Sequence, residues 1–95
     1  MVEQTVRVIN RAGLHSRPAA ILVQLTLKYK SSILIEKEGR QVNGKSIMGV
    51  ITLAAHYGTE LKIITEGEDE EELITAVVNL FNARFRDNDE DDEEI

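Results

Sequence analysis

The sequence predicts an α+β domain in which a four-stranded antiparallel sheet is covered on one face by three helices. Four short segments with apolar residues, bounded by turn-forming residues, read as strands, and three other segments read as helices, in the order β-α-β-β-α-β-α. The connections are too short for a doubly wound parallel sheet. Since the chain has 95 residues and no cysteine, one packed core must stabilise it.

The chain begins with a predicted strand and a predicted helix. Valines alternate with polar residues over residues 2–8, which predicts a half-buried strand that ends in the turn-forming cluster 10–13. A helix is expected over residues 16–29, because Pro18 is tolerated only in a first turn. Its apolar residues at helical spacing are Ala19, Ala20, Val23 and Leu27.

A hairpin and a short helix come next. Residues 33–35 and 41–42 read as two strands joined by a turn at Glu38-Gly39. The short helix is expected to begin after Ser46, a good N-cap, and to reach Leu53 or Ala54.

A fourth strand precedes the last helix, which is the clearest element of the chain. Apolar residues within 61–64 predict a strand that Gly67 ends. Asp69 and Glu72 stand at the spacing of a capping box, in an acidic first turn. The apolar face of the helix that begins there consists of Leu73, Val77, Leu80 and Phe81.

The negative charge of the chain is concentrated at its end. The net charge is -6, but residues 1–86 carry 11 basic and 10 acidic side chains, and the other seven acidic residues lie within 87–94. We therefore predict one domain over 1–86 and a solvated, disordered acidic tail over 87–95. The chain shows neither an apolar run of ~20 residues nor a signal peptide, so we expect a cytoplasmic protein without membrane insertion.

His15 is the strongest candidate for chemistry. A histidine at a helix start faces exposed backbone N–H groups and the positive end of the helix dipole, which favour a neutral ring with a nucleophilic nitrogen. The same N–H groups can bind phosphate oxygens, and Arg17 adds a guanidinium that suits phosphate. No metal site is expected, because no second ligand stands at a suitable spacing. The spacing of these residues alone is also consistent with His15 being a surface histidine without a chemical role.

Two segments together carry a family resemblance. Gly13-Leu14-His15-Ser16-Arg17-Pro18-Ala19 and Val42-Asn43-Gly44-Lys45-Ser46-Ile47-Met48-Gly49-Val50 resemble the two signature segments of HPr proteins, the phosphocarriers of the bacterial phosphoenolpyruvate-dependent phosphotransferase system. The resemblance extends from residue 2 to about residue 86 and implies the HPr-like open-faced sandwich, which agrees with the element order derived above. It departs at Ala12, where many relatives carry a hydroxyl or amide side chain, and at the acidic end of the chain.

The resemblance implies a relay. Enzyme I would donate a phosphoryl group to Nδ1 of His15, and the carrier would pass it to IIA proteins or domains in sugar uptake. Arg17 would pair with the phosphate, and Ser16 would contribute contacts at the helix start. The chain would then be a monomeric carrier without a cofactor, and not an enzyme. A purely regulatory, nitrogen-branch relay is the alternative.

The second segment implies regulation and partner binding. Ser46 is an N-cap by position, and in many HPr proteins the matching serine is also phosphorylated by HPr kinase/phosphorylase. By the same resemblance, Ile47, Met48 and Val50 are candidates for an apolar patch that partners contact. For Ile47 and Met48, burial in the core is the alternative.

The sequence gives much less support to two other functions, a nucleotide-binding P-loop protein and a module that binds RNA or a metabolite. Residues 39–46 match the G-x-x-x-x-G-K-S pattern of a P-loop, but they read as a strand between the two glycines. A module that binds RNA or a metabolite is disfavoured by a nearly neutral body with two Phe and two Tyr, so no nucleic-acid partner is expected. His56 is expected to be a surface residue after the second helix.

Overall fold

One antiparallel sheet and three helices make up the fold, in a computed structural model that describes residues 1–85. The predicted acidic tail, 87–95, lies outside the described residues. The elements in chain order are β1 (Val2–Arg7), α1 (Ser16–Thr26), β2 (Ser32–Lys37), β3 (Arg40–Asn43), α2 (Ile47–Thr52), β4 (Glu60–Glu66) and α3 (Glu70–Asn82). The predicted fold class and element order are confirmed. None of these helices is long and apolar enough to cross a membrane.

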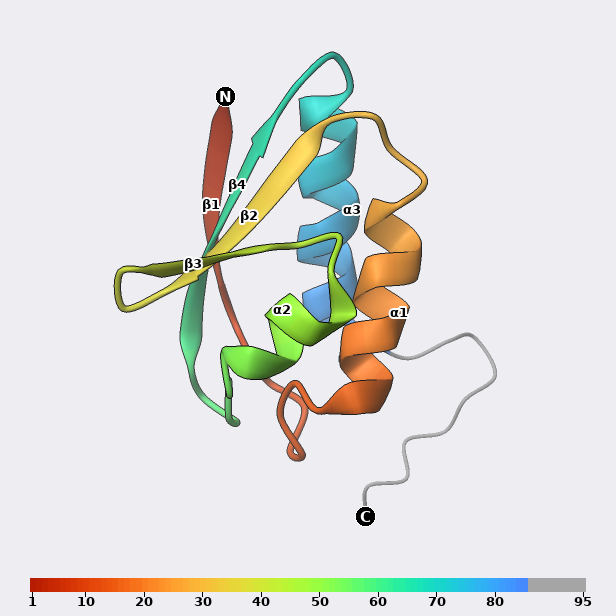
Figure 1. Ribbon diagram of the computed structural model, residues 1–95. Coiled ribbons are helices and arrows are strands. Elements are labelled where there is room, and N and C mark those ends of the chain that lie inside the picture. Colours follow the sequence, from red (N-terminus) through yellow and green to blue (C-terminus); the bar gives the residue numbers. More distant parts are fainter. Residues whose placement is uncertain (86–95) are drawn as a thin grey trace.

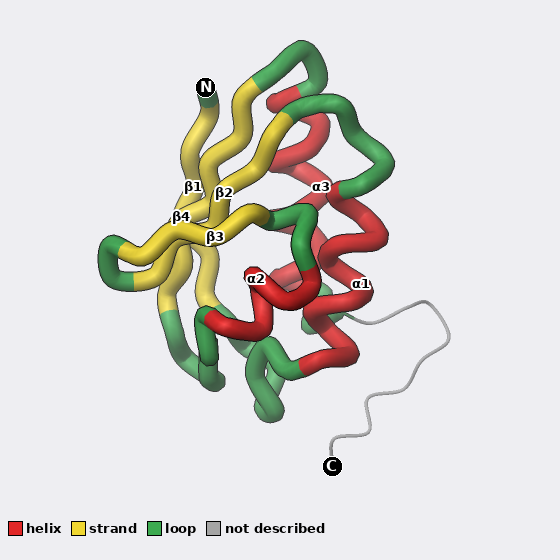
Figure 2. Tube along the Cα trace, viewed as in Figure 1, coloured by secondary structure: helices red, strands yellow, loops and turns green. Residues whose placement is uncertain are grey.

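The sheet has a helical layer on one face only. Its strand order is β1-β4-β2-β3, and every pairing is antiparallel. Figure 1 shows the helices together on one side of the sheet, and Figure 2 shows the opposite side without any covering element among the described residues. Alternate side chains of the three longer strands point into the layer between sheet and helices, which forms the core. These inward residues are Val6, Ile33, Ile35, Leu61, Ile63 and Thr65.

The β2–β3 hairpin turns at Glu38 and Gly39, as predicted. Both residues have positive φ, 51° and 86°, as expected of the two-residue turns that match strand twist. The hairpin also supports α2: Lys37 Nζ donates to the Leu53 carbonyl at 3.0 Å, and Arg40 donates to the Thr52 carbonyl at 2.8 Å. Cations at a helix C-terminus satisfy its unpaired carbonyls, so the hairpin fixes the end of this short helix.

The end of α1 differs from the prediction. The helix ends at Thr26, three residues earlier than expected, and Leu27 is 61% exposed instead of buried. Thr26 takes the core position, because its hydroxyl donates to the Gly44 carbonyl at 2.8 Å and thereby satisfies a polar group inside the core. A pattern that counts only apolar residues misses such a buried threonine.

The predicted capping box of α3 is also wrong. Asp69 is the N-cap residue, but its side chain makes no cap hydrogen bond. Its carboxylate instead accepts hydrogen bonds from the Ser31 hydroxyl and from the amides of Lys30 and Ser31, in the α1–β2 connection. Glu70 accepts from the Gly67 amide at 3.1 Å. Asp69 therefore ties α3 to a segment nearly 40 residues away in the sequence.

This arrangement predicts a dependence of stability on pH. The Ser31 hydroxyl and the Lys30 amide lower the pKa of Asp69 from 3.8 to about 2. The charged carboxylate therefore stabilises the fold above pH ~4, and this contribution is lost as the pH falls towards ~2. We expect Asp69→Asn to lower the melting temperature at neutral pH and to flatten its decline between pH ~4 and ~2.

Glu68→Gln is the matched control, because it removes a neighbouring carboxylate whose only described ion pair, with Lys30, is on the surface. This variant should keep the wild-type acid profile. Equal acid profiles for Asp69→Asn and the wild type would contradict the role given to Asp69.

Candidate functional site

The loop between β1 and α1 is fixed to the connection between α2 and β4. The Leu14 amide donates to the Ala55 carbonyl at 2.9 Å. The Val8 amide donates to the Thr59 carbonyl at 2.9 Å, and the Gly58 amide donates to the Val8 carbonyl at 2.7 Å. Leu14 itself is buried in the core. These hydrogen bonds therefore hold in place the backbone that leads into His15, the next residue.

Gly13 allows this close approach. Its φ is +79°, a conformation that side chains disfavour, and a Cβ at this position would lie 2.7 Å from the Ala55 carbonyl oxygen. The loop contact therefore requires glycine at position 13.

We expect Gly13→Ala to destabilise the protein by about 2–4 kcal/mol, because backbone strain and a clash with a backbone carbonyl add together. Urea unfolding measures this loss. Gly39→Ala is the matched control, since Gly39 also has positive φ, +86°, but nothing lies within 4 Å of the added Cβ. It should cost only the strain, about 1 kcal/mol. Equal costs at both positions would show that the loop contact is unimportant.

His15 occupies the N-cap of α1. Its φ and ψ of -86° and -164° are extended, its side chain is exposed, and it makes no cap hydrogen bond. Its own carbonyl accepts from the Ala19 amide at 3.0 Å. Helix geometry provides no acceptor within α1 for the first amides, and Pro18 has no N–H. The donors at this helix start are therefore the backbone amides of Ser16 and Arg17, directly beside the imidazole.

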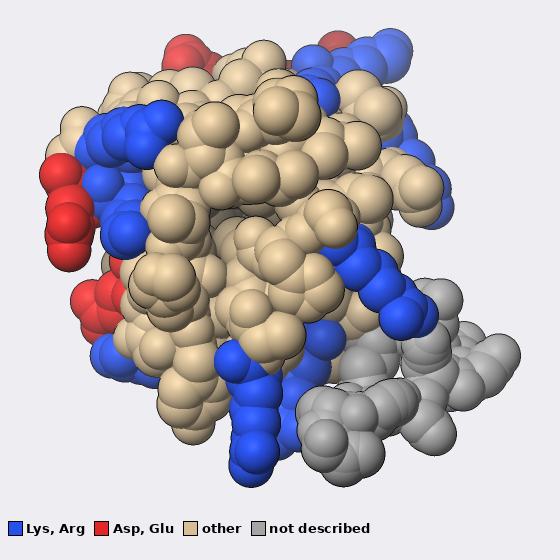
Figure 3. Space-filling view, turned by 60° about the horizontal axis from the view of Figure 1, so that its bottom comes forward, with Lys and Arg blue, Asp and Glu red and all other residues tan. Residues whose placement is uncertain are grey.

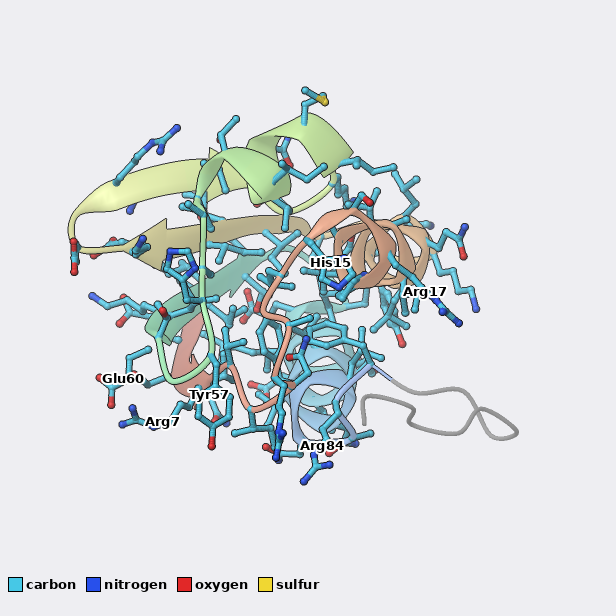
Figure 4. All side chains as sticks on the ribbon, turned by 90° about the horizontal axis from the view of Figure 1, so that it is seen from below. Arg7, His15, Arg17, Tyr57, Glu60 and Arg84 are labelled. Atoms are coloured by element: carbon cyan, nitrogen blue, oxygen red, sulfur yellow. The ribbon has the colours of Figure 1, made fainter. Side chains whose placement is uncertain are left out.

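Further arginines lie at the same end of the molecule. Seen from below, Figure 4 shows His15 at the start of α1 and Arg17 extending from the first turn of the helix. Arg84 projects on this side too, just after the end of α3, and Arg11 is exposed in the same loop as His15. Sequence reasoning missed Arg84, because only the antiparallel packing of α1 and α3 brings the end of α3 to this side. It also missed Arg11, although this residue is only four positions before His15 in the sequence.

The residues of the second signature segment, 42–50, differ in how exposed they are. Ser46 is the N-cap of α2, as predicted, and its Oγ accepts from the Gly49 amide at 3.0 Å. Ile47 and Met48 are 40% and 68% exposed, so neither is a core residue. Val50, predicted to contact partners, is completely buried and cannot do so without unfolding. The short helix turns this residue inward, onto the face that packs in the core.

A match to a family model identifies the family of this chain. Residues 2–83 match the model described as the PTS HPr component phosphorylation site. The chain belongs to the HPr family. It is therefore a phosphocarrier and not an enzyme.

Individual HPr proteins support the same assignment. The phosphocarrier protein HPr of Treponema pallidum (strain Nichols) is 46% identical over 87 residues, 92% of this chain and 99% of the relative. The HPr-like protein Crh of Bacillus subtilis (strain 168) is 47% identical over 74 residues, 78% of this chain and 87% of Crh. The crystal structure of HPr-C-His from Thermoanaerobacter tengcongensis has a TM-score of 0.87 and 46% identity, covering 90% of this chain and 96% of that chain.

The HPr fold also explains the P-loop match. Gly39 lies in the hairpin turn, and all four residues between the two glycines form β3, which pairs antiparallel with β2. A P-loop needs an open loop after a buried strand of a parallel sheet. The match over 39–46 is therefore coincidental. His56 is exposed in the connection after α2, as predicted.

Proposed function

We propose that this HPr protein accepts a phosphoryl group from enzyme I on His15 and passes it to a IIA protein or domain in sugar uptake. The observation that carries the proposal is the position of His15, exposed at a helix N-cap with no cap hydrogen bond to give up. In this proposal the chain works as a monomer in the cytoplasm.

The transfer itself requires a free ring nitrogen. Nδ1 of His15 attacks the phosphorus with its lone pair, a new N–P bond forms, and the bond between phosphorus and the donor breaks with its electrons returning to the donor. In the second transfer a nucleophile of the acceptor protein attacks the phosphorus, and the N–P bond breaks with its electrons returning to Nδ1. Neither step consumes a cofactor, so the carrier needs only to hold and release the phosphoryl group.

Backbone donors and a guanidinium stabilise the phosphorylated state in this proposal. The amides of Ser16 and Arg17 lie at the positive end of an 11-residue helix, where anionic oxygens bind favourably. Arg17 adds a permanent positive charge from the same turn. Ala12 offers no side-chain donor, so the site depends on these groups more than in relatives with a hydroxyl or amide there.

Docking and regulation are assigned to α2. Ile47 and Met48 are exposed on a helix that packs against α1, which suits an apolar contact with enzyme I and IIA proteins. Ser46, at the start of that helix, is the proposed target of HPr kinase/phosphorylase. A phosphate there would be tolerated by the helix dipole and would place negative charge beside the apolar contact.

The test is a transfer experiment in two steps. The protein is labelled with phosphoenolpyruvate and enzyme I from the same cell, and the protein that next takes the label from it is identified. Label on a IIA component of a sugar transporter supports the proposal. Label that passes only to a regulatory protein would favour the nitrogen-branch relay, and failure of the chain to take label would refute the proposed carrier role.

A further inference from the structure

The connection between α2 and β4 contains a residue in an unusual conformation. Ala54 has a φ of +54°, in the left-handed region that a side chain disfavours. It is exposed, whereas Leu53 and Ala55 on either side of it are 2% and 3% exposed. The left-handed residue therefore turns the chain so that both neighbours pack in the core. Because this position does not carry a glycine, contacts around Ala54 must offset the backbone strain.

A lysine at the end of β2 provides such contacts. Lys37 Nζ donates to the Leu53 carbonyl at 3.0 Å and to the Ala54 carbonyl at 3.2 Å. These carbonyls belong to the two peptide groups that flank the Cα of Ala54, and the φ and ψ of this residue set how the two peptide planes are oriented. One ammonium group therefore restrains both planes and holds the left-handed conformation between them.

The same connection also holds the backbone before His15. The Ala55 carbonyl accepts from the Leu14 amide at 2.9 Å, and His15 directly follows Leu14. A rotation about φ of Ala54 moves the chain after it, including the Ala55 carbonyl. If Ala54 relaxed to a negative φ, this carbonyl would turn away from the Leu14 amide. The position of the loop before His15 therefore depends on the conformation of Ala54.

We propose that Lys37 is a positioning residue for His15 and acts through Ala54. Its two hydrogen bonds hold the left-handed turn, and the turn directs the Ala55 carbonyl to the loop before the imidazole. Both of these bonds go to the connection after α2, so Lys37 acts on the site from a distance. This role in phosphoryl transfer rests on the proposed function.

Positive charges are numerous at the end of the molecule where His15 lies. With this end turned forward, Figure 3 shows Lys and Arg spread over the face, and Asp and Glu only at its left edge and at its top. The loss of any one of these positive charges can weaken anion binding by itself. A variant that restores the turn at Ala54 without restoring the charge of Lys37 separates the two causes.

The experiment compares three variants. Lys37→Met removes the ammonium and keeps an unbranched side chain. Lys62→Met is the matched control, because it removes the same charge from a lysine on the uncovered face of the sheet, 4.0 Å from a carboxylate oxygen of Glu36. The double variant Lys37→Met/Ala54→Gly also lacks the ammonium, but a glycine adopts the left-handed conformation without steric cost.

Two measurements report on the loop without enzyme I. Hydrogen exchange of the Leu14 amide measures how often its bond to the Ala55 carbonyl opens. The Gly44 amide, which donates to the Ile33 carbonyl at 2.8 Å, reports whether the sheet beside the hairpin stays folded. Inorganic phosphate is also titrated into each ¹⁵N-labelled protein, and the amide signal of Ser16 reports binding.

Lys37→Met should exchange the Leu14 amide about 10-fold faster than the wild type or more, with the exchange of Gly44 unchanged. It should bind phosphate about 2- to 3-fold more weakly, because apparent affinity falls with the fraction of molecules in the competent conformation. Lys62→Met should exchange Leu14 at the wild-type rate. The double variant should return both values to within about 2-fold of the wild type, a recovery that the lost charge cannot explain.

Wild-type exchange of Leu14 in Lys37→Met, or an equal acceleration in Lys62→Met, would overturn the inference. Faster exchange of Gly44 would do the same, because the change would then be global. Phosphate binding that stays weak in the double variant would assign the effect to the lost charge and overturn it as well. Since neither measurement needs enzyme I, a failure of His15 to take label would refute the proposed function and leave this test valid.

Discussion

His15→Ala should abolish the labelling of this chain by phosphoenolpyruvate and enzyme I, whereas the wild type should acquire an acid-labile, alkali-stable phosphate. The fold should survive. His15 is exposed and makes no cap hydrogen bond, so its removal should change the free energy of unfolding by no more than about 0.5 kcal/mol. Radiolabel on the protein and its urea unfolding curve measure the two effects separately.

His56→Ala is the matched control, because it removes the other histidine, which is also exposed but lies in the connection after α2. Its labelling should equal that of the wild type. Normal labelling of His15→Ala, or loss of label in His56→Ala, would place the phosphoryl group elsewhere and contradict the proposed site.

Ser46→Asp should slow phosphoryl transfer from enzyme I about 5- to 150-fold without unfolding the protein. A carboxylate caps a helix about as well as the serine hydroxyl that now accepts from the Gly49 amide, so stability should change by at most about 0.5 kcal/mol. The new charge lies beside Ile47 and Met48, however, and must be desolvated when a partner docks there. This penalty of about 1–3 kcal/mol produces the slower rate.

Ser46→Ala separates the charge from the cap. It should lower stability by about 1 kcal/mol, because the Gly49 amide loses its acceptor, but it adds no charge and should transfer at nearly the wild-type rate. Transfer rates measured with phosphorylated enzyme I, under conditions where both variants are folded, decide the matter. If both variants slow phosphoryl transfer equally, or if neither slows it, Ser46 acts only as a helix cap.

Local patterns were sufficient to predict the elements and part of the site. The alternation of valines in β1, the turn at Glu38-Gly39 and the N-cap at Ser46 each depend on a few neighbouring residues, and all three are confirmed. The start of α1 directly after His15 is confirmed for the same reason: Pro18 restricts where that helix can begin.

Features that depend on tertiary contacts could not be predicted in this way. The carboxylate of Asp69 turns away from its own helix because Ser31 and Lys30 offer it better donors, and no local pattern contains them. Val50 is buried because of how α2 sits on the core, and sequence resemblance alone could not give its exposure. Arg84 comes to the end of the molecule where His15 lies only because α3 runs antiparallel to α1.

The backbone hydrogen bonds that join the β1–α1 loop to the α2–β4 connection have a consequence for recognition. Val8 and Leu14 bond to Thr59 and Ala55, more than 40 residues away, so neither loop can open without releasing the other. The backbone around His15 therefore loses little conformational entropy when a donor or an acceptor binds. In the proposed relay the carrier meets two proteins in succession and leaves both. A preorganised target would let each encounter be specific while remaining weak and brief.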